Sequence, residues 1–272
     1  MSVPNFGDIS KSANDLLNKD FYHLSATTFE LKSNTPNNVA FKVTGKTSHE
    51  KTTAGATWNT AAALDTKVEL ADSLAKGLKA EGVFSFLPSA GEKAASKKGA
   101  KFNLTFKQSN FHSRAFFDLL KGPTANIDAV VGHEGFLAGA SAGYDVQKAS
   151  VTGYAAAVGY QAPTYSAAIT ASDNLSVFAA SYYHKVNSQV EAGAKATWNS
   201  KAGNNVGLEV ASKYRIDPVS FAKFKVNNNG VAALGYNVLL REGVTLGLGA
   251  SFDTQKLDQA THKLGASFTF EG

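Results

Sequence analysis

Apolar and polar side chains alternate with a period of two along most of this 272-residue chain, and this pattern constrains the fold more than any other feature. In the run 101–107, Phe102, Leu104 and Phe106 alternate with lysine, asparagine and threonine. The same pattern recurs in four further runs, residues 64–70, 190–198, 208–211 and 244–252. Successive side chains of a β-strand point to opposite faces, so each run predicts a strand with one apolar face and one polar or small face.

Turn-forming residues separate these runs. They are Asn37-Asn38, Gly122-Pro123, Ser172-Asp173-Asn174, Gly203-Asn204-Asn205, Asn227-Asn228-Asn229-Gly230 and Glu242-Gly243. Membrane strands are about 10 residues long and are joined by short turns, so the chain after its first segment has room for roughly 17 to 20 strands. Neither a linker nor a second helical segment interrupts the pattern, so residues 23–272 are expected to form one β-domain.

The first 22 residues differ from the rest. Pro4 stands where a helix can begin, and Asp8 and Lys19 suit the two ends of a helix dipole. An apolar stripe at helical spacing comprises Phe6, Ile9, Ala13, Leu16 and Leu17. We therefore expect a short amphipathic helix over residues 5–19, followed by a linker that ends near residue 22. A packing helix on a soluble domain is the alternative.

The character of the two strand faces favours an all-β transmembrane barrel over a soluble sandwich. In a sandwich the inward faces carry bulky residues, because two sheets must interdigitate. Here the polar faces mix Gly, Ala, Ser and Thr with Lys and Glu, which suits a water-filled lumen, and the modest apolar faces suit lipid. A closed barrel also pairs every backbone group within the membrane. The chain has no apolar run of 18 residues that would predict a membrane-spanning helix.

Composition and motifs argue against an enzyme, a cofactor or a metal site. The chain has no cysteine, and its six histidines are dispersed without ligand spacing. His133-Glu134 lacks the second histidine of a zinc protease motif, and no phosphate-binding loop is present. The net charge of +5 indicates anionic partners. The basic cluster at residues 93–101 is interpreted as a solvated loop, so no nucleic-acid partner is expected.

Several segments resemble the mitochondrial outer-membrane porins of the voltage-dependent anion channel (VDAC) family, fungal type. The N-terminal segment 2–22, the Gly-Leu-Lys run at 77–79 and the stretch from Tyr214 to Ser220 each resemble the family's motifs. The end of the chain resembles the signal by which such barrels are recognised for membrane insertion, on Lys263, Gly265, Phe268 and Phe270.

This resemblance implies a barrel of about 17 to 19 strands, the family number being 19, with parallel first and last strands and the helix inside the pore. The implied function is a voltage-gated, weakly anion-selective channel for ATP, ADP, phosphate and other small metabolites across the mitochondrial outer membrane. A related barrel that serves protein import is the alternative. Implied partners are membrane lipids and sterol, the outer-membrane import and barrel-assembly machinery, and a further copy in a homo-oligomer.

The chain departs from the family in three places. The segment 46–64 is shorter than in the family by most of a β-hairpin. Loss of two strands keeps the direction of every later strand relative to the first, so we expect 17 strands, or 19 with two shortened. Phe224 stands where the family prefers a small residue. The linker Asp20–His23 has no glycine, so we expect it to be stiffer than the glycine-rich linker of animal members.

Charged side chains on the helix and on polar strand faces are the predicted pore and selectivity residues, since lysines attract anions. They are Asp8, Lys11, Asp15, Lys19, Lys67, Lys76, Lys79, Lys101 and Lys107. Lys11, Lys19 and Lys79 are also the predicted nucleotide contacts, and Asp8 and Asp15 would temper the positive field. For the other lysines, the alternative is a solvent-exposed position without a role in selectivity. Ile9, Leu16 and Leu17 are predicted to pack the helix against the wall.

Overall fold

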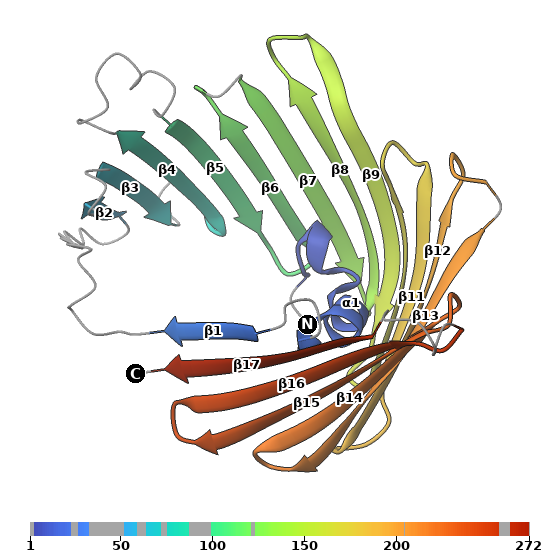
Figure 1. The fold of residues 1–272 in the computed structure, drawn as a ribbon. Coiled ribbons are helices and arrows are strands. Elements are labelled where there is room, and N and C mark those ends of the chain that lie inside the picture. Colours follow the sequence, from blue (N-terminus) through green and yellow to red (C-terminus); the bar gives the residue numbers. More distant parts are fainter. Residues whose placement is uncertain are drawn as a thin grey trace. The chain divides into compact units, whose positions relative to one another are not determined.

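Strands make up most of the described chain, as the alternation predicts (Figure 1). The computed structural model describes residues 3–22, 27–32, 52–58, 64–71, 75–86, 99–120, 123–203, 205–255 and 262–271. These residues contain seventeen strands and form two units. The first unit comprises Met1–Phe6, Pro36–Ala157 and Ser172–Leu175, and the second comprises Gly7–Thr35, Val158–Ala171 and Ser176–Gly272.

The first unit is an antiparallel sheet in which consecutive strands pair with one another from β2 to β8. Its strands are β2 (Thr52–Trp58), β3 (Leu64–Ala71), β4 (Leu78–Phe86), β5 (Gly99–Lys107), β6 (Phe111–Asp118), β7 (Thr124–His133) and β8 (Phe136–Asp145). The strand β9 (Ser150–Gln161) has residues in both units. A two-residue turn joins β7 to β8. Its residues Glu134 and Gly135 have φ of 50° and 90°, as a tight hairpin that matches the strand twist requires.

The second unit holds the remaining strands, paired antiparallel in chain order from β11 to β17. They are β1 (Thr27–Lys32), β10 (Tyr165–Ser172), β11 (Val177–Lys185), β12 (Val190–Asn199), β13 (Val206–Asp217), β14 (Ser220–Asn227), β15 (Val231–Arg241), β16 (Val244–Asp253) and β17 (Lys263–Glu271). The five runs chosen from their alternation all lie in strands of one unit or the other.

The first and last strands pair in parallel, as the family resemblance implies. Thr27 of β1 is aligned with Ala266 of β17, and the pairing continues to Lys32 and Glu271 (Figure 1). Parallel pairing of the two end strands requires an odd number of alternating strands, in agreement with the seventeen that the described residues contain. The predicted short segment at 46–64 lies mostly outside the described residues, which resume at β2.

The N-terminal helix is shorter than predicted. A 3-10 helix, η1, covers Phe6–Asp8, and the α-helix α1 covers Lys11–Asn18. The expected single helix over 5–19 is therefore interrupted at Ile9-Ser10. Gly7 has low helix propensity, and Ser10 adopts a non-helical conformation with φ −106° and ψ 18° at the start of α1. No helix among the described residues is both long and apolar enough to cross a membrane.

The sheet of the second unit has one face that carries α1 and an opposite face rich in exposed apolar side chains. On β13, Ala211 is 1% exposed beneath the helix, whereas its neighbour Val210 is 52% exposed on the other face. The exposed apolar residues of this face include Leu208, Val210, Tyr214, Leu234, Tyr236, Leu248 and Leu264. A soluble sandwich would bury such a face against a second sheet, so its exposure favours contact with lipid.

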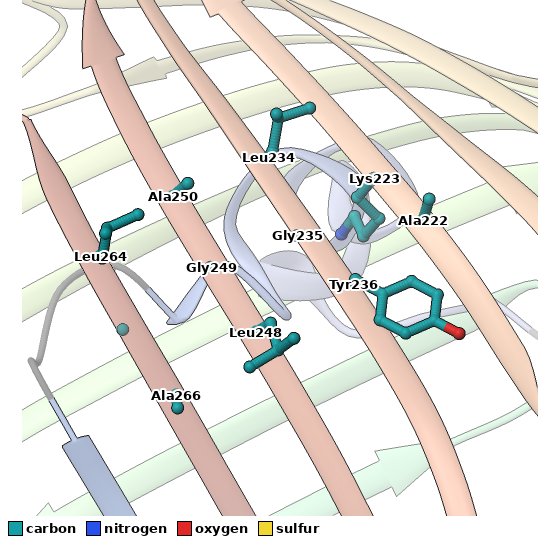
Figure 2. Close-up of a pocket in the computed structure, with 11 residues that line it drawn as sticks. Ala222, Lys223, Leu234, Gly235, Tyr236, Leu248, Gly249, Ala250, Leu264 and Ala266 are labelled. Carbon is teal, nitrogen blue, oxygen red and sulfur yellow. The ribbon is translucent and has the colours of Figure 1, made fainter.

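A groove of about 630 Å³ opens on this apolar face over β14 to β17. Figure 2 shows Leu234, Tyr236, Leu248 and Leu264 around it, with alanines and glycines between them. The side chain of Lys223 is directed away from this face, toward the helix behind the strands (Figure 2). The alternation of β14 thus places a cation on the helix side and apolar groups on the other side.

Candidate functional site

The helix α1 lies on the polar face of the second unit, over β11, β12 and β13 (Figure 1). Leu16 and Leu17, which are 4% and 0% exposed, pack with Ala211. Gly193 of β12 permits this close approach, because a Cβ atom there would lie 2.9 Å from Leu16 Cδ2. Ile9 is buried as well, so the structure buries all three side chains that the sequence assigns to helix packing.

A polar cavity of about 320 Å³ lies between α1 and the sheet of the second unit. Its lining carries three carboxylates, three ammonium groups and two hydroxyls beside one leucine. The residues are Ser12, Asp15, Leu16, Lys19, Asp20, Tyr183, Glu191, Lys213 and Lys223. The two predicted helix charges Asp15 and Lys19 therefore share a cavity with four charged strand and linker residues that were not predicted.

Each helix lysine is paired with a helix carboxylate. Lys11 Nζ lies 3.4 Å from Asp8 Oδ1, and Lys19 Nζ donates to Asp15 Oδ2 at 2.9 Å. The hydrogen bond to Asp15, with the charge of that carboxylate, raises the pKa of Lys19 above its ordinary value. Both lysine side chains remain open to solvent, at 56% and 62% exposure.

The predicted lysines of the first unit lie on β3 to β5 and in the turn before β4. Lys79 of β4 forms an ion pair with Glu69 of β3 at 2.8 Å. Lys101 and Lys107 of β5 and Lys76 of the turn are exposed. Lys67 belongs to β3 and is aligned with Gly55 and Val83 on the neighbouring strands. Lys79 and Glu69 are thus brought together by sheet register, which the sequence alone did not predict.

Four strand lysines beside the helix were missed as site residues. Lys195 of β12 donates to Asn14 Oδ1 at 3.0 Å, and Lys225 of β14 lies 3.8 Å from Glu209. Lys213 of β13 lies over the ring of Phe221 at 4.2 Å. The fourth, Lys223 of β14, donates to the carbonyl oxygens of Asp15 in α1 and of Lys19 directly after it. Period-two alternation extended along β13 and β14 is the signal that could have identified Lys213, Lys223 and Lys225.

A second unpredicted ion pair joins two neighbouring strands of the first unit. Arg114 of β6 and Asp128 of β7 are aligned in the register, and Arg114 Nη2 lies 2.6 Å from Asp128 Oδ2. The Arg114 Nε also donates to the same carboxylate at 3.1 Å, which gives a two-pronged contact. The two side chains are 25% and 10% exposed, so this pair is a largely buried cross-strand link.

The predicted insertion-signal residues all lie on β17. Phe268 and its aligned neighbour Leu246 belong to the apolar face, and Phe270 is aligned with Leu31 of β1. Gly265 is aligned with Gly249 of β16. Lys263 is exposed at the start of the strand. The last strand of the chain therefore carries all four residues.

The arrangement on the helix-bearing face suits reversible attraction of ions. It offers solvent-exposed ammonium groups beside carboxylates in an open polar cavity. In the described ranges, no three His, Cys, Asp or Glu side chains gather as a metal-ligand set.

Comparison with known proteins identifies the family of the chain. The model of the eukaryotic porin family matches residues 2–265. The chain is 77% identical to the mitochondrial outer membrane protein porin of Neurospora crassa, with 100% of both chains covered. It is 46% identical to the Candida albicans protein of the same name, over 99% of each chain, and 40% identical to the non-selective voltage-gated ion channel 1 of Saccharomyces cerevisiae, over 100% of each.

The alignment with the Neurospora protein has 287 positions, whereas this chain has 272 residues. The relative therefore carries residues that this chain lacks, in agreement with the expectation of a shortened chain. Their placement at 46–64 stays a prediction.

A solved structure supports the fold class independently. A mutant of the Rh. blastica porin matches with a TM-score of 0.51 at 10% identity, over 76% of this chain and 88% of that chain. At this identity the likeness concerns the fold alone. Together with the family match it confirms the predicted class, an all-β transmembrane barrel with an N-terminal helix. The chain belongs to the eukaryotic porin family.

Proposed function

We propose that this chain is a voltage-gated, weakly anion-selective channel through which ATP, ADP, phosphate and other small metabolites diffuse across the mitochondrial outer membrane. Its relatives are named as mitochondrial outer membrane porins and voltage-gated ion channels. The observation that carries the proposal is the two-faced sheet, apolar on one side and bearing a charged helix and lysines on the other. Passive diffusion through such a structure requires no catalytic group.

The anion preference follows from a small surplus of cations. Four lysines of the proposed pore face lie beside carboxylates, which cancel part of their field. The pairs are Lys11–Asp8, Lys19–Asp15, Lys79–Glu69 and Lys225–Glu209. At physiological salt the field of an exposed charge decays over about 8 Å. The remaining surplus therefore favours anions only near the wall, and a wide pore still admits cations.

Nucleotide phosphates are expected to contact Lys11, Lys19 and Lys79. All three ammonium groups are accessible, and each already has a carboxylate partner with which a phosphate must compete. This competition keeps binding weak, and conduction needs rapid release. Lys67, Lys76, Lys101 and Lys107 would add to the positive field without holding a ligand.

The remaining partners are proposed from the apolar face and from β17. Lipid chains and sterol would cover the exposed leucine, valine and tyrosine side chains of the second unit. The import and barrel-assembly machinery would recognise the β17 residues Lys263, Gly265, Phe268 and Phe270. A homo-oligomer would use part of the same apolar face.

Recording from the refolded chain in planar bilayers tests the proposal. In a KCl gradient we expect a reversal potential of the sign that denotes mild anion preference, and stepwise closure as the voltage rises in either direction. Liposomes loaded with ATP should lose it only when they contain the chain. A folded, inserted protein that conducts no ions and releases no ATP would overturn the proposed function.

A further inference from the structure

Lys223 of β14 binds the carboxyl-terminal end of α1. Its side chain is only 2% exposed. The ammonium group donates to the carbonyl oxygen of Lys19 at 2.8 Å and lies 3.3 Å from that of Asp15. The last carbonyl groups of a helix lack partners within the helix and carry the negative end of its dipole. The Asp15 carbonyl oxygen also accepts from the Lys19 N–H, and the Lys19 carbonyl lies just after the helix. The buried cation therefore satisfies the Lys19 carbonyl and is a second partner for that of Asp15.

The residues that follow the helix complete the surroundings of this ammonium group. Asp20 Oδ2 lies 3.9 Å away, and the ring of Phe21 has its centre 4.9 Å away, within range of a cation–π interaction. A cation this deeply buried is costly unless it is paired and hydrogen-bonded. Protein groups of the helix end and the linker thus replace water around the Lys223 ammonium group. The same contacts fix the position of the helix end and the linker.

The linker continues across two further strands. Asn237 of β15 donates to the hydroxyl oxygen of Tyr22 at 2.6 Å, and the Tyr22 ring contacts Gly247 of β16. A Cβ atom on Gly235 of β15 would lie 2.5 Å from the Asp20 carbonyl oxygen, so glycine is needed there. We call Lys223, Gly235, Asn237 and Gly247 the dock.

Asp20 has φ of 59°, a left-handed conformation that non-glycine residues seldom adopt. In this linker the strain falls on an aspartate whose backbone and side chain both face the dock. Such strain persists only where the surroundings hold it. The linker is therefore positioned by the sheet that it crosses.

We propose that Lys223 is a positioning residue, which with the dock holds the end of the helix and the linker on β14 to β16. If the helix must leave the wall for the channel to close, release of Lys223 from the helix carbonyls is part of that step. The role of Lys223 in closing rests on the proposed channel function, whereas its positioning role does not.

A spin label on the helix end tests the positioning role. The chain has no cysteine, so Asn18→Cys, at an exposed residue of α1, gives a single labelling site. Adding Lys223→Met removes the ammonium group and keeps the length of the side chain. We expect the population of mobile label to rise at least about tenfold, since hydrogen bonds to charged groups are strong. The control is Lys148→Met, which removes a charge from an exposed lysine between β8 and β9, outside the dock.

A second variant perturbs the dock from the linker side and leaves every charge in place. Gly235→Ala puts a methyl group against the Asp20 carbonyl oxygen and should free the label in the same way. Its control is Gly207→Ala on β13, where the new methyl group would lie 3.7 Å from the nearest atom, a backbone oxygen. An immobile label in folded Gly235→Ala and Lys223→Met proteins would overturn the positioning role. If Lys223→Met fails to fold, Gly235→Ala alone decides.

Bilayer recording then tests the link to gating. We expect the Lys223→Met channel to close at a lower voltage than the parent, and the Gly207→Ala channel to close at the parent voltage. A mobile label with an unchanged closing voltage would overturn the link to gating. If the parent chain forms no pore at all, the label still reports on the dock, so the two proposals fail separately.

Discussion

Truncation of Leu17 should undock the N-terminal helix without unfolding the strands. The Leu17 side chain is 0% exposed and packs with Leu16 and Ala211. A buried Leu→Ala change costs about 2–5 kcal/mol. Because the helix is a short segment that packs on the sheet, the lost packing energy weakens the docking of the helix and leaves the pairing of the strands intact. Each 1.4 kcal/mol is a factor of ten, so the docked-to-undocked ratio should fall by roughly 30-fold or more.

Hydrogen exchange of the peptide that covers α1 measures this ratio. An eight-residue helix is unstable in water by itself, so its amides exchange whenever it leaves the sheet. In Leu17→Ala we expect the protection of the α1 amides to fall by roughly 30-fold or more, while the amides of β12 and β13 keep their protection. Asn18→Ala, at an exposed residue of the same helix, is the control and should exchange like the parent. Parent-like protection of α1 in folded Leu17→Ala protein would refute the reasoning.

Three further predictions concern charges. Charge reversal at Lys19 and Lys79 should lower the anion preference in planar bilayers, and unchanged reversal potentials would contradict their assigned role. Asp128→Asn leaves Arg114 without its carboxylate and should lower the free energy of unfolding by about 1–3 kcal/mol, read from thermal denaturation in detergent; Arg114→Gln in the same background should restore part of it. Because the Asp15 carboxylate raises the pKa of Lys19, the folded state favours the charged lysine, and this effect is lost as pH rises through the raised pKa. Asp15→Asn should therefore move the Lys19 titration, followed by NMR, to lower pH.

The strands could be predicted from the sequence because the alternation of faces depends only on neighbouring residues in the chain. A residue such as Val210 or Ala211 belongs to one face or the other through the backbone geometry of its own strand, whatever lies beside it. The same is true of the apolar side of the helix, where Leu16 and Leu17 are buried. The helix boundaries were less well predicted, since the interruption at Ser10 is a backbone conformation that the apolar spacing does not encode.

The candidate site was predicted only in part. Lysines at the helix and on polar faces could be named, but their partners could not. Glu69 meets Lys79, and Arg114 meets Asp128, through register between strands that the turns and pairing fix. The absence of glycine in the linker predicted stiffness, whereas the structure shows hydrogen bonds to Lys19 and Tyr22 from Lys223 and Asn237, on strands more than 200 residues later.

The amino-acid sequence by itself determined that this chain forms two-faced strands preceded by an amphipathic helix, and its motifs identified the family. Only the tertiary structure decided which cations are exposed, which are paired, and that Lys223 is buried at the end of the helix. The reason is physical: periodicity is a property of neighbouring residues, whereas the energy of a buried charge depends on the atoms that surround it, and the fold brings those together from distant parts of the chain.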